Sequence, residues 1–123
     1  MSKCLVVDDS RTIRKAIISI LNELRVESRE AENGAKALEM CAADMPDFIM
    51  LDWNMPVLDG LGFLKQLRAT PAGKQPKVVF CTTETDLTLI TQALSEGADE
   101  YIMKPFTREI VEEKLKIVGI LPS

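Results

Sequence analysis

The sequence contains no histidine, and its three cysteines, Cys4, Cys41 and Cys81, stand far apart along the chain. Structural zinc sites draw on histidines and closely spaced cysteine pairs, so these residues do not support one. An odd number of scattered cysteines also provides no disulfide framework. We therefore expect three small buried side chains in a protein of a reducing compartment.

Long apolar runs are also missing, because no run approaches the roughly 20 residues that cross a bilayer. The segment 1–7 leads into Asp8 and Asp9 and lacks the apolar region and cleavage site of an export signal. Basic residues are not in excess either: 15 oppose 19 acidic residues, giving a net charge of −4. Proteins that hold nucleic acid through its phosphates are usually basic. We expect a cytoplasmic protein with neither a membrane nor a nucleic acid as partner.

The chain has 123 residues, of which 46% are hydrophobic and 28% charged. These values are typical of one globular domain with a single core. No linker or low-complexity segment divides the sequence. We therefore expect a single domain over residues 1–123, without an attached effector domain.

Short apolar runs alternate with helical patterns five times. The runs expected as strands span residues 3–7, 26–31, 47–52, 77–82 and 100–103. Ser10, Asn33, Asp86 and Thr107 are placed to cap four of the five helices. Apolar strands separated by helices indicate a parallel sheet covered on both faces. The sequence thus predicts a three-layer, doubly wound α/β fold of five strand–helix units.

In the helix after Asp86, the apolar side chains expected to face the sheet are Leu87, Ile90, Ala93 and Leu94. The spacing places them on one side of a short helix. Gly97 is the expected stop.

Polar residues follow four of the predicted strands. Asp8 and Asp9 follow the first, Asp52 ends the third, Thr82 ends the fourth, and Lys104 follows the fifth. Ligands of open parallel sheets bind at this edge. Clustered carboxylates repel one another unless a cation joins them, and oxygen ligands suit Mg²⁺. We expect Asp9, Asp52 and a main-chain carbonyl after Asp52 as direct ligands, with Asp8 acting through a water.

The ammonium of Lys104 and the hydroxyl of Thr82 are side-chain groups suited to contacting an anion. A phosphoryl group carried on a carboxylate would meet both, and phosphoryl transfer depends on such positioning and charge neutralisation. A carboxylate can act as the nucleophile and form an acyl phosphate. Asp52 is the best candidate, because it ends the central strand between the metal acids and the Thr82–Lys104 pair.

The ordered set of motifs resembles the signature of response-regulator receiver domains over nearly the whole chain. The matching segments are Val6-Val7-Asp8-Asp9-Ser10, Asp52-Trp53-Asn54-Met55-Pro56, Asp59-Gly60, Thr82 and Lys104-Pro105-Phe106. The segment that begins at Asp52 is also similar to that of stand-alone chemotaxis regulators.

The resemblance implies a flavodoxin-like fold with strand order 2-1-3-4-5. It implies that Asp52 accepts a phosphoryl group from a phosphohistidine on a histidine kinase or phosphotransfer protein. Asp8 and Asp9 would match the acidic metal pair, and the main-chain carbonyl of Asn54 the backbone ligand of Mg²⁺, or of Mn²⁺ in its place. Because the chain lacks histidine, the donor must be another molecule.

Further roles follow from the same resemblance. Thr82 and Tyr101 would be the switch pair, although Tyr101 also fits a half-buried strand residue. Asn54 and Glu84 would tune the hydrolysis of the acyl phosphate. The Lys104–Pro105 peptide bond is a candidate for the cis isomer. The fourth helix, fifth strand and fifth helix would form the surface that binds a downstream protein, such as a flagellar motor switch component. The protein itself is expected to be a monomer.

Three functions remain open on the sequence alone. The first is a signalling switch that supports its own phosphorylation and dephosphorylation without being an enzyme. The second is a phosphate sink for a shared kinase, which would use the same residues. The third is a small Mg²⁺-dependent phosphatase with an aspartyl-phosphate intermediate. Against the third, Asn54 stands two residues after Asp52, where a second acid would provide general acid–base catalysis.

Overall fold

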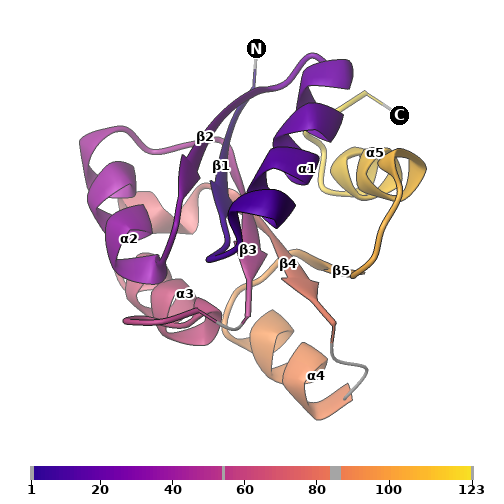
Figure 1. The fold of residues 1–123 in the computed structure, drawn as a ribbon. Coiled ribbons are helices and arrows are strands. Elements are labelled where there is room, and N and C mark those ends of the chain that lie inside the picture. The colour runs from indigo at the N-terminus through magenta and orange to yellow at the C-terminus, as the bar shows by residue number, and fades with distance from the viewer. Residues whose placement is uncertain (1, 54, 84–86, 123) are drawn as a thin grey trace.

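The computed structural model describes residues 2–53, 55–83 and 87–122 (Figure 1). In chain order the elements are β1 (Lys3–Val7), α1 (Arg11–Glu23), β2 (Glu27–Ala31), α2 (Gly34–Ala43), β3 (Phe48–Asp52), α3 (Gly60–Arg68), the short 3₁₀ helix η1 (Ala72–Lys74), β4 (Lys77–Thr82), α4 (Leu87–Ser95), β5 (Glu100–Met103) and α5 (Arg108–Ile117). Among these residues, none of the helices has both the length and the apolar character that spanning a bilayer requires.

The strands of the described residues form one parallel five-stranded sheet in the order β2-β1-β3-β4-β5. This confirms the predicted α/β fold and strand order. The register aligns the carboxyl ends of the strands, because Val7 pairs with Leu51 and Asp52 pairs with Cys81. Residues that end neighbouring strands therefore share one edge of the sheet.

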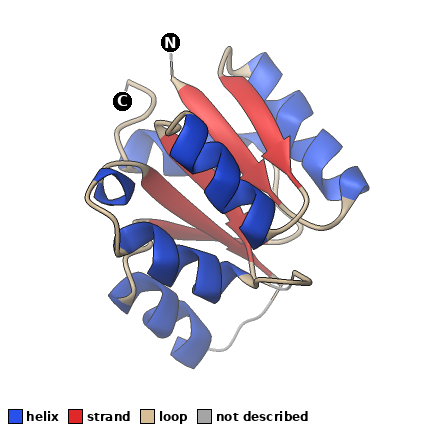
Figure 2. Cartoon of the chain, turned by 90° about the vertical axis from the view of Figure 1, so that its left-hand side faces the viewer, coloured by secondary structure: helices blue, strands red, loops and turns tan. Residues whose placement is uncertain are grey.

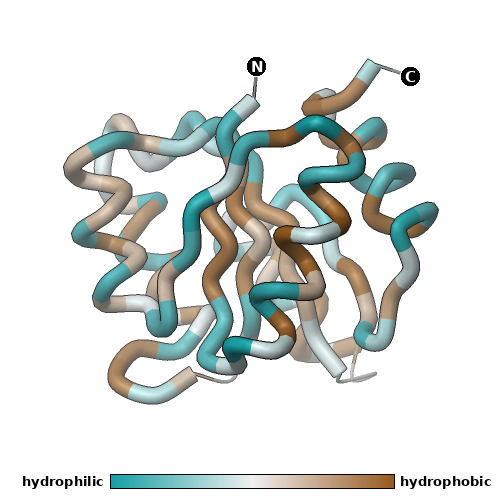
Figure 3. The backbone as a smooth tube through the Cα atoms, turned by 45° about the horizontal axis from the view of Figure 1, so that its top comes forward, coloured by the Kyte–Doolittle hydropathy of each residue, from teal (hydrophilic) through white to brown (hydrophobic). Residues whose placement is uncertain are grey.

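Helices cover the sheet on both sides, as Figure 2 shows. Successive strand residues point to opposite faces of the sheet. Leu5 and Val7 belong to the core under α2, α3 and α4, whereas Cys4 and Val6 belong to the core under α1 and α5. Hydrophobic segments run along the inner strands in Figure 3, and hydrophilic segments lie mainly on the outer turns of the helices. Both cores consist of buried apolar side chains that pack the helices onto the sheet, which gives the sheet edge a firm base.

The helix caps follow the predictions where the structure describes them. Ser10, Asn33 and Thr107 each accept a hydrogen bond from the main-chain N–H three positions further on. The predicted cap at Asp86 lies outside the described residues. Two predicted strands each begin one residue too early, since β2 begins at Glu27 and β3 at Phe48.

The predicted inward face of α4 is wrong for two of its four residues. Ile90 and Ala93 are buried, but Leu87 is 73% exposed and Leu94 is 41% exposed. This helix has nine residues and covers the edge of the sheet near β4 and β5. Only the narrow stripe formed by Ile90 and Ala93 contacts the core there, so the flanking leucines remain in solvent.

Candidate phosphoacceptor and metal site

Three carboxylates meet at the carboxyl edge of the sheet. Asp8 follows β1, Asp9 comes next, and Asp52 is the last residue of β3, the strand beside β1. One carboxylate oxygen from each lies within 4.8 Å of the others. Asp8 and Asp52 are 2% and 8% exposed, whereas Asp9 is open to solvent. The structure thus brings together the acids that the sequence placed at strand ends.

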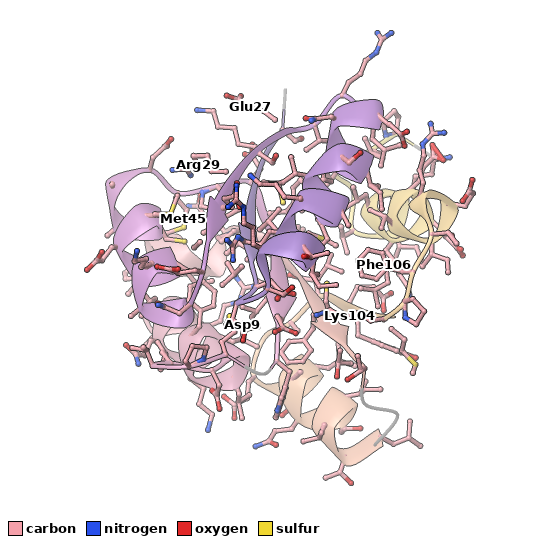
Figure 4. All side chains as sticks on the ribbon, viewed as in Figure 1. Asp9, Glu27, Arg29, Met45, Lys104 and Phe106 are labelled. Atoms are coloured by element: carbon pink, nitrogen blue, oxygen red, sulfur yellow. The ribbon has the colours of Figure 1, made fainter. Side chains whose placement is uncertain are left out.

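Lys104 reaches this cluster from the segment after β5. Its Nζ donates hydrogen bonds of 2.9 Å to Asp8 Oδ2 and 2.8 Å to Asp52 Oδ1. Its own main-chain N–H donates to the carbonyl of Thr82, and the Lys104–Pro105 peptide bond is cis. The long side chain therefore extends past the end of β4 to reach β3, and Figure 4 shows Asp9 and Lys104 at the same end of the sheet.

Burial and charge set the electrostatics of the cluster. Burial, followed by repulsion from Asp8 and Asp9, raises the pKa of Asp52 above its ordinary value even with Lys104 beside it. Burial by itself would lower the pKa of Lys104, but hydrogen bonds to Asp52 and Asp8 raise it, so the ammonium is charged at neutral pH. Three carboxylates and one ammonium leave two negative charges uncompensated.

The two predicted switch residues lie on neighbouring strands. Thr82 is buried at the end of β4, between the strand of Asp52 and the strand that leads to Lys104. Tyr101 on β5 is half-buried and packs against the core beneath α4. The ammonium of Lys114 on α5 lies 5.0 Å from the centre of its ring. Lys114 thus adds a contact that strand periodicity alone could not indicate.

Other predicted residues divide between described and undescribed positions. Asn54 and Glu84, the predicted modulators of hydrolysis, lie outside the described residues. Trp53, next to Asp52, is half-buried, and its ring meets Phe80 edge-to-face with 5.1 Å between centroids. Trp53 therefore combines a packing role with partial exposure beside the candidate phosphoacceptor.

The segment after Asp52 turns back tightly onto the end of β3. The N–H of Gly60 donates to the carbonyl of Trp53 over 3.0 Å, and Asp59 caps α3 by accepting from the N–H of Gly62. A Cβ on Gly60 would collide with the main-chain carbonyl of Asp52. The absence of a side chain at Gly60 is what allows α3 to begin so close to Asp52.

Three charged residues near the cluster, Arg14, Lys15 and Glu30, were not identified by the sequence analysis. Arg14 on α1 donates a 2.7 Å hydrogen bond to the main-chain carbonyl of Asp8 and forms a 2.7 Å ion pair with Glu30 on β2. Lys15 pairs with the other oxygen of Glu30, also at 2.7 Å. These bonds, the one from Lys15 first, lower the pKa of Glu30. One indication for Arg14 was present in the sequence: it lies one helical turn after the Ser10 cap, at the end of α1 that is nearest Asp8.

The arrangement of fold and site defines a class of protein. Residues 4–116 match the family described as the response regulator receiver domain. The chain belongs to this family, whose members act as signalling switches.

Within the family, the chain is similar to chemotaxis proteins of the CheY type. It is 40% identical over 118 residues to chemotaxis protein CheY1 of Helicobacter pylori, covering 94% of this chain and 95% of that protein. It is 36% identical over 115 residues to CheY of Pseudomonas aeruginosa, covering 93% of each chain. The crystal structure of Vibrio cholerae CheY4 superposes with a TM-score of 0.91 at 33% identity, covering 96% of this chain and 98% of that one. The protein is a CheY-like receiver domain.

Receiver domains bind Mg²⁺ at an acidic pocket, and the residues of this chain fit that ion. The donors are hard carboxylate oxygens, three of which lie within 4.8 Å of one another. The two uncompensated charges of the cluster match a divalent cation. Mg²⁺ commonly takes one or two carboxylates and keeps several waters, which suits the exposed Asp9 beside the buried Asp52.

Proposed function

We propose that this protein is a phosphorylation-dependent signalling switch of two-component signalling in which Asp52 is the phosphoacceptor. The observation that supports this most strongly is the Lys104 ammonium, which bridges Asp8 and Asp52 within a cluster of three carboxylates. A purely structural cluster would not need a third acid that stands open to solvent. The donor is a phosphohistidine of a histidine kinase or a histidine phosphotransfer protein.

The proposed reaction is a displacement at phosphorus. A carboxylate oxygen of Asp52 attacks the phosphorus of the phosphohistidine, a P–O bond forms, and the P–N bond breaks. The electron pair of that bond returns to the imidazole nitrogen of the donor, which takes up a proton from water. The product is an acyl phosphate on Asp52, and its later hydrolysis releases inorganic phosphate. Asp52 itself is buried, at 8% exposed, but it lies beside the exposed Asp9 at the rim of the sheet, from which the phosphorus would approach.

The groups around Asp52 would neutralise the negative charge of the phosphoryl group. Asp9, Asp52 and the main-chain carbonyl of Asn54 would hold Mg²⁺ directly, with Asp8 acting through a water. When bound, Mg²⁺, or Mn²⁺ in its place, supplies positive charge that neutralises the phosphoryl oxygens. Lys104 contributes a second positive charge, because its ammonium already lies 2.8 Å from Asp52. In this proposal Asn54 and Glu84 set the hydrolysis rate by orienting water.

Signal output would pass from the phosphoryl group to Thr82 and Tyr101. The hydroxyl of Thr82 would move to the phosphoryl oxygens, and the ring of Tyr101 would turn inward into the space that it leaves. The surface formed by α4, β5 and α5 carries exposed apolar side chains that suit a protein partner. They include Leu87, Leu94, Met103 and Ile110. Because the similar proteins are chemotaxis proteins, we propose a motility target such as a flagellar motor switch component.

We further propose that residues 1–123 act as a single monomeric domain in the cytoplasm. The three cysteines of the described chain are free and buried, as suits a reducing compartment. Burial raises the pKa of the Cys81 thiol to about 12 and of the Cys41 thiol to about 11, so both stay protonated at neutral pH.

Phosphotransfer from a radiolabelled histidine kinase tests the proposal. The wild type should acquire a label that resists acid and is lost in base, and Asp52→Asn should acquire none. Label retained by Asp52→Asn would overturn the assignment of the phosphoacceptor. A pull-down with and without beryllofluoride, an acyl-phosphate mimic, then separates the functions: a partner captured only with the mimic supports the switch, whereas none supports a phosphate sink.

A further inference from the structure

The side chain of Arg14 ties α1 to the end of β1 directly beside the acidic cluster. Its Nη1 donates to the main-chain carbonyl of Asp8, and its Nε pairs with Glu30 Oε1, both over 2.7 Å. Only 13% of the Arg14 side chain is exposed. Because Asp8 is almost fully buried, this bond satisfies a carbonyl that has lost contact with water.

The carbonyl that Arg14 holds belongs to the peptide unit that joins Asp8 to Asp9. A peptide unit is planar, so fixing its oxygen also fixes the direction in which the chain continues to Asp9. Asp9 itself is exposed, and packing therefore restrains its position little. The Arg14 bond thus restrains the peptide unit from which the Asp9 residue continues.

The ion pair with Glu30 fixes the orientation of the Arg14 guanidinium. The pairing is charge-assisted, and Glu30 lies on β2, which is in register with β1: Glu30 pairs with Val6, and Ala31 pairs with Val7. The carbonyl of Ala31 also accepts the N–H of Asp8 over 3.2 Å. Both sides of the Asp8 backbone are therefore anchored, one by the end of β2 and the other by an arginine that β2 orients.

We propose that Arg14 is a positioning residue for the Mg²⁺ site, acting through the Asp8–Asp9 peptide unit rather than through its charge. The inference rests on the proposed function, because it takes the three carboxylates as the metal site. Partners that orient metal ligands typically contribute about 10- to 100-fold to metal affinity. Arg14 belongs to this class without touching the ion.

Lys15 provides a matched control. It also pairs with Glu30 at 2.7 Å and carries the same charge, but no bond joins it to Asp8 in the described structure. Lys15→Gln therefore removes a positive charge near the site and leaves the carbonyl of Asp8 held. Arg14→Lys does the reverse, since it keeps the charge but loses the planar fork that holds Glu30 and the carbonyl together.

The test is calorimetric titration of the unphosphorylated full chain with MgCl₂ alone. We expect Arg14→Gln to raise the Kd for Mg²⁺ about tenfold and Arg14→Lys about threefold. Lys15→Gln should stay within about twofold of the wild type. Thermal melting by circular dichroism confirms that each variant is folded, and Arg14→Lys carries the test should Arg14→Gln fail to fold.

Two results would overturn the inference while leaving the proposed function intact. One is wild-type Mg²⁺ affinity in both Arg14 variants. The other is an equal change in Arg14→Gln and Lys15→Gln, which would show that only charge matters. A wild-type chain that binds no Mg²⁺ would instead overturn the proposed function, and the inference with it.

Discussion

The Lys104 ammonium and the Asp52 carboxylate are 2.8 Å apart, although 52 residues separate them in the chain. The lysine also holds Asp8 at 2.9 Å, so one cation is shared by two buried acids. One ammonium does not neutralise three carboxylates, so the cluster keeps a net negative charge. The acid of the three that Lys104 does not contact in the described structure is Asp9, which lies at the exposed rim. Stability and reactivity at this edge therefore depend on the same few charges.

Asp52→Asn should make the protein more stable at pH 7 without Mg²⁺. The substitution removes one of three repelling charges, and an amide oxygen can still accept from Lys104. We expect a gain of about 1 kcal/mol in the free energy of unfolding, or ~4 °C in Tm. Thermal melting measures it, and Asp44→Asn, at an exposed position outside the cluster, should show no gain.

The stability gain of Asp52→Asn should also depend on pH. Because the pKa of Asp52 is raised in the folded state, the folded protein binds a proton before the unfolded chain does as the pH falls. The wild type therefore gains stability as the pH drops through the range just above the ordinary pKa of a carboxyl group. The melting curves of wild type and Asp52→Asn should converge near pH 4, about the pKa of a free aspartate. A gap that stays constant with pH would contradict this origin.

Lys104→Ala should destabilise the protein at neutral pH by about 3 kcal/mol, because it leaves two buried carboxylates without their shared cation. Lowering the pH should restore much of the loss, since Asp52 then takes up a proton. Adding Mg²⁺ should do the same by replacing the missing charge. Urea denaturation measures these effects, and Lys65→Ala on the exposed side of α3 should change stability by less than about 0.5 kcal/mol.

Mg²⁺ should stabilise the wild type but not Asp9→Ala. A ligand that binds only the folded state at 100 times its Kd contributes about 2.7 kcal/mol. Asp9 is exposed, so its removal should leave the metal-free protein folded. Melting curves with and without MgCl₂, together with Trp53 fluorescence, measure both effects. Glu39→Ala, an exposed acid on α2, should respond to Mg²⁺ as the wild type does; an equal response of Asp9→Ala would argue against a metal ligand at that position.

Gly60→Ala should lower the free energy of unfolding by about 3 kcal/mol and slow phosphotransfer to Asp52. Its new Cβ would meet the main-chain carbonyl of Asp52, which cannot move without shifting the end of β3. Gly62→Ala is the matched control, because its Cβ meets mainly the flexible end of Leu58 at 2.7 Å. We expect it to stay within about 1 kcal/mol of the wild type, since alanine also favours the helix. Equal losses in urea denaturation would disprove the proposed difference.

The sequence predicted the layers and the acidic edge because both follow from local patterns. Apolar runs locate the strands, and Asp8, Asp52 and Thr82 stand at strand ends whatever the order of the strands. The order itself came from the family resemblance. It decides that β1 and β3 are neighbours, and therefore that their acids meet.

Contacts made across the fold could not be predicted in this way. Whether Leu87 and Leu94 are buried depends on how much of the sheet α4 covers, which helical spacing does not state. The bond from Arg14 to the carbonyl of Asp8 joins a side chain to a main-chain group, and its partner Glu30 lies 16 residues further on. Such pairs become visible only once strand register and helix placement are fixed.

The direction of the strands also has a practical consequence for handling this molecule. β1 begins, and α5 ends, at the rim opposite Asp9 and Lys104, where Figure 1 places both ends of the chain. An anchor or fluorescent fusion joined at either end would point away from the acids. A chain tethered to a sensor chip in this way would present its acidic edge to the solution, where a histidine kinase could reach Asp52 in the proposed phosphotransfer.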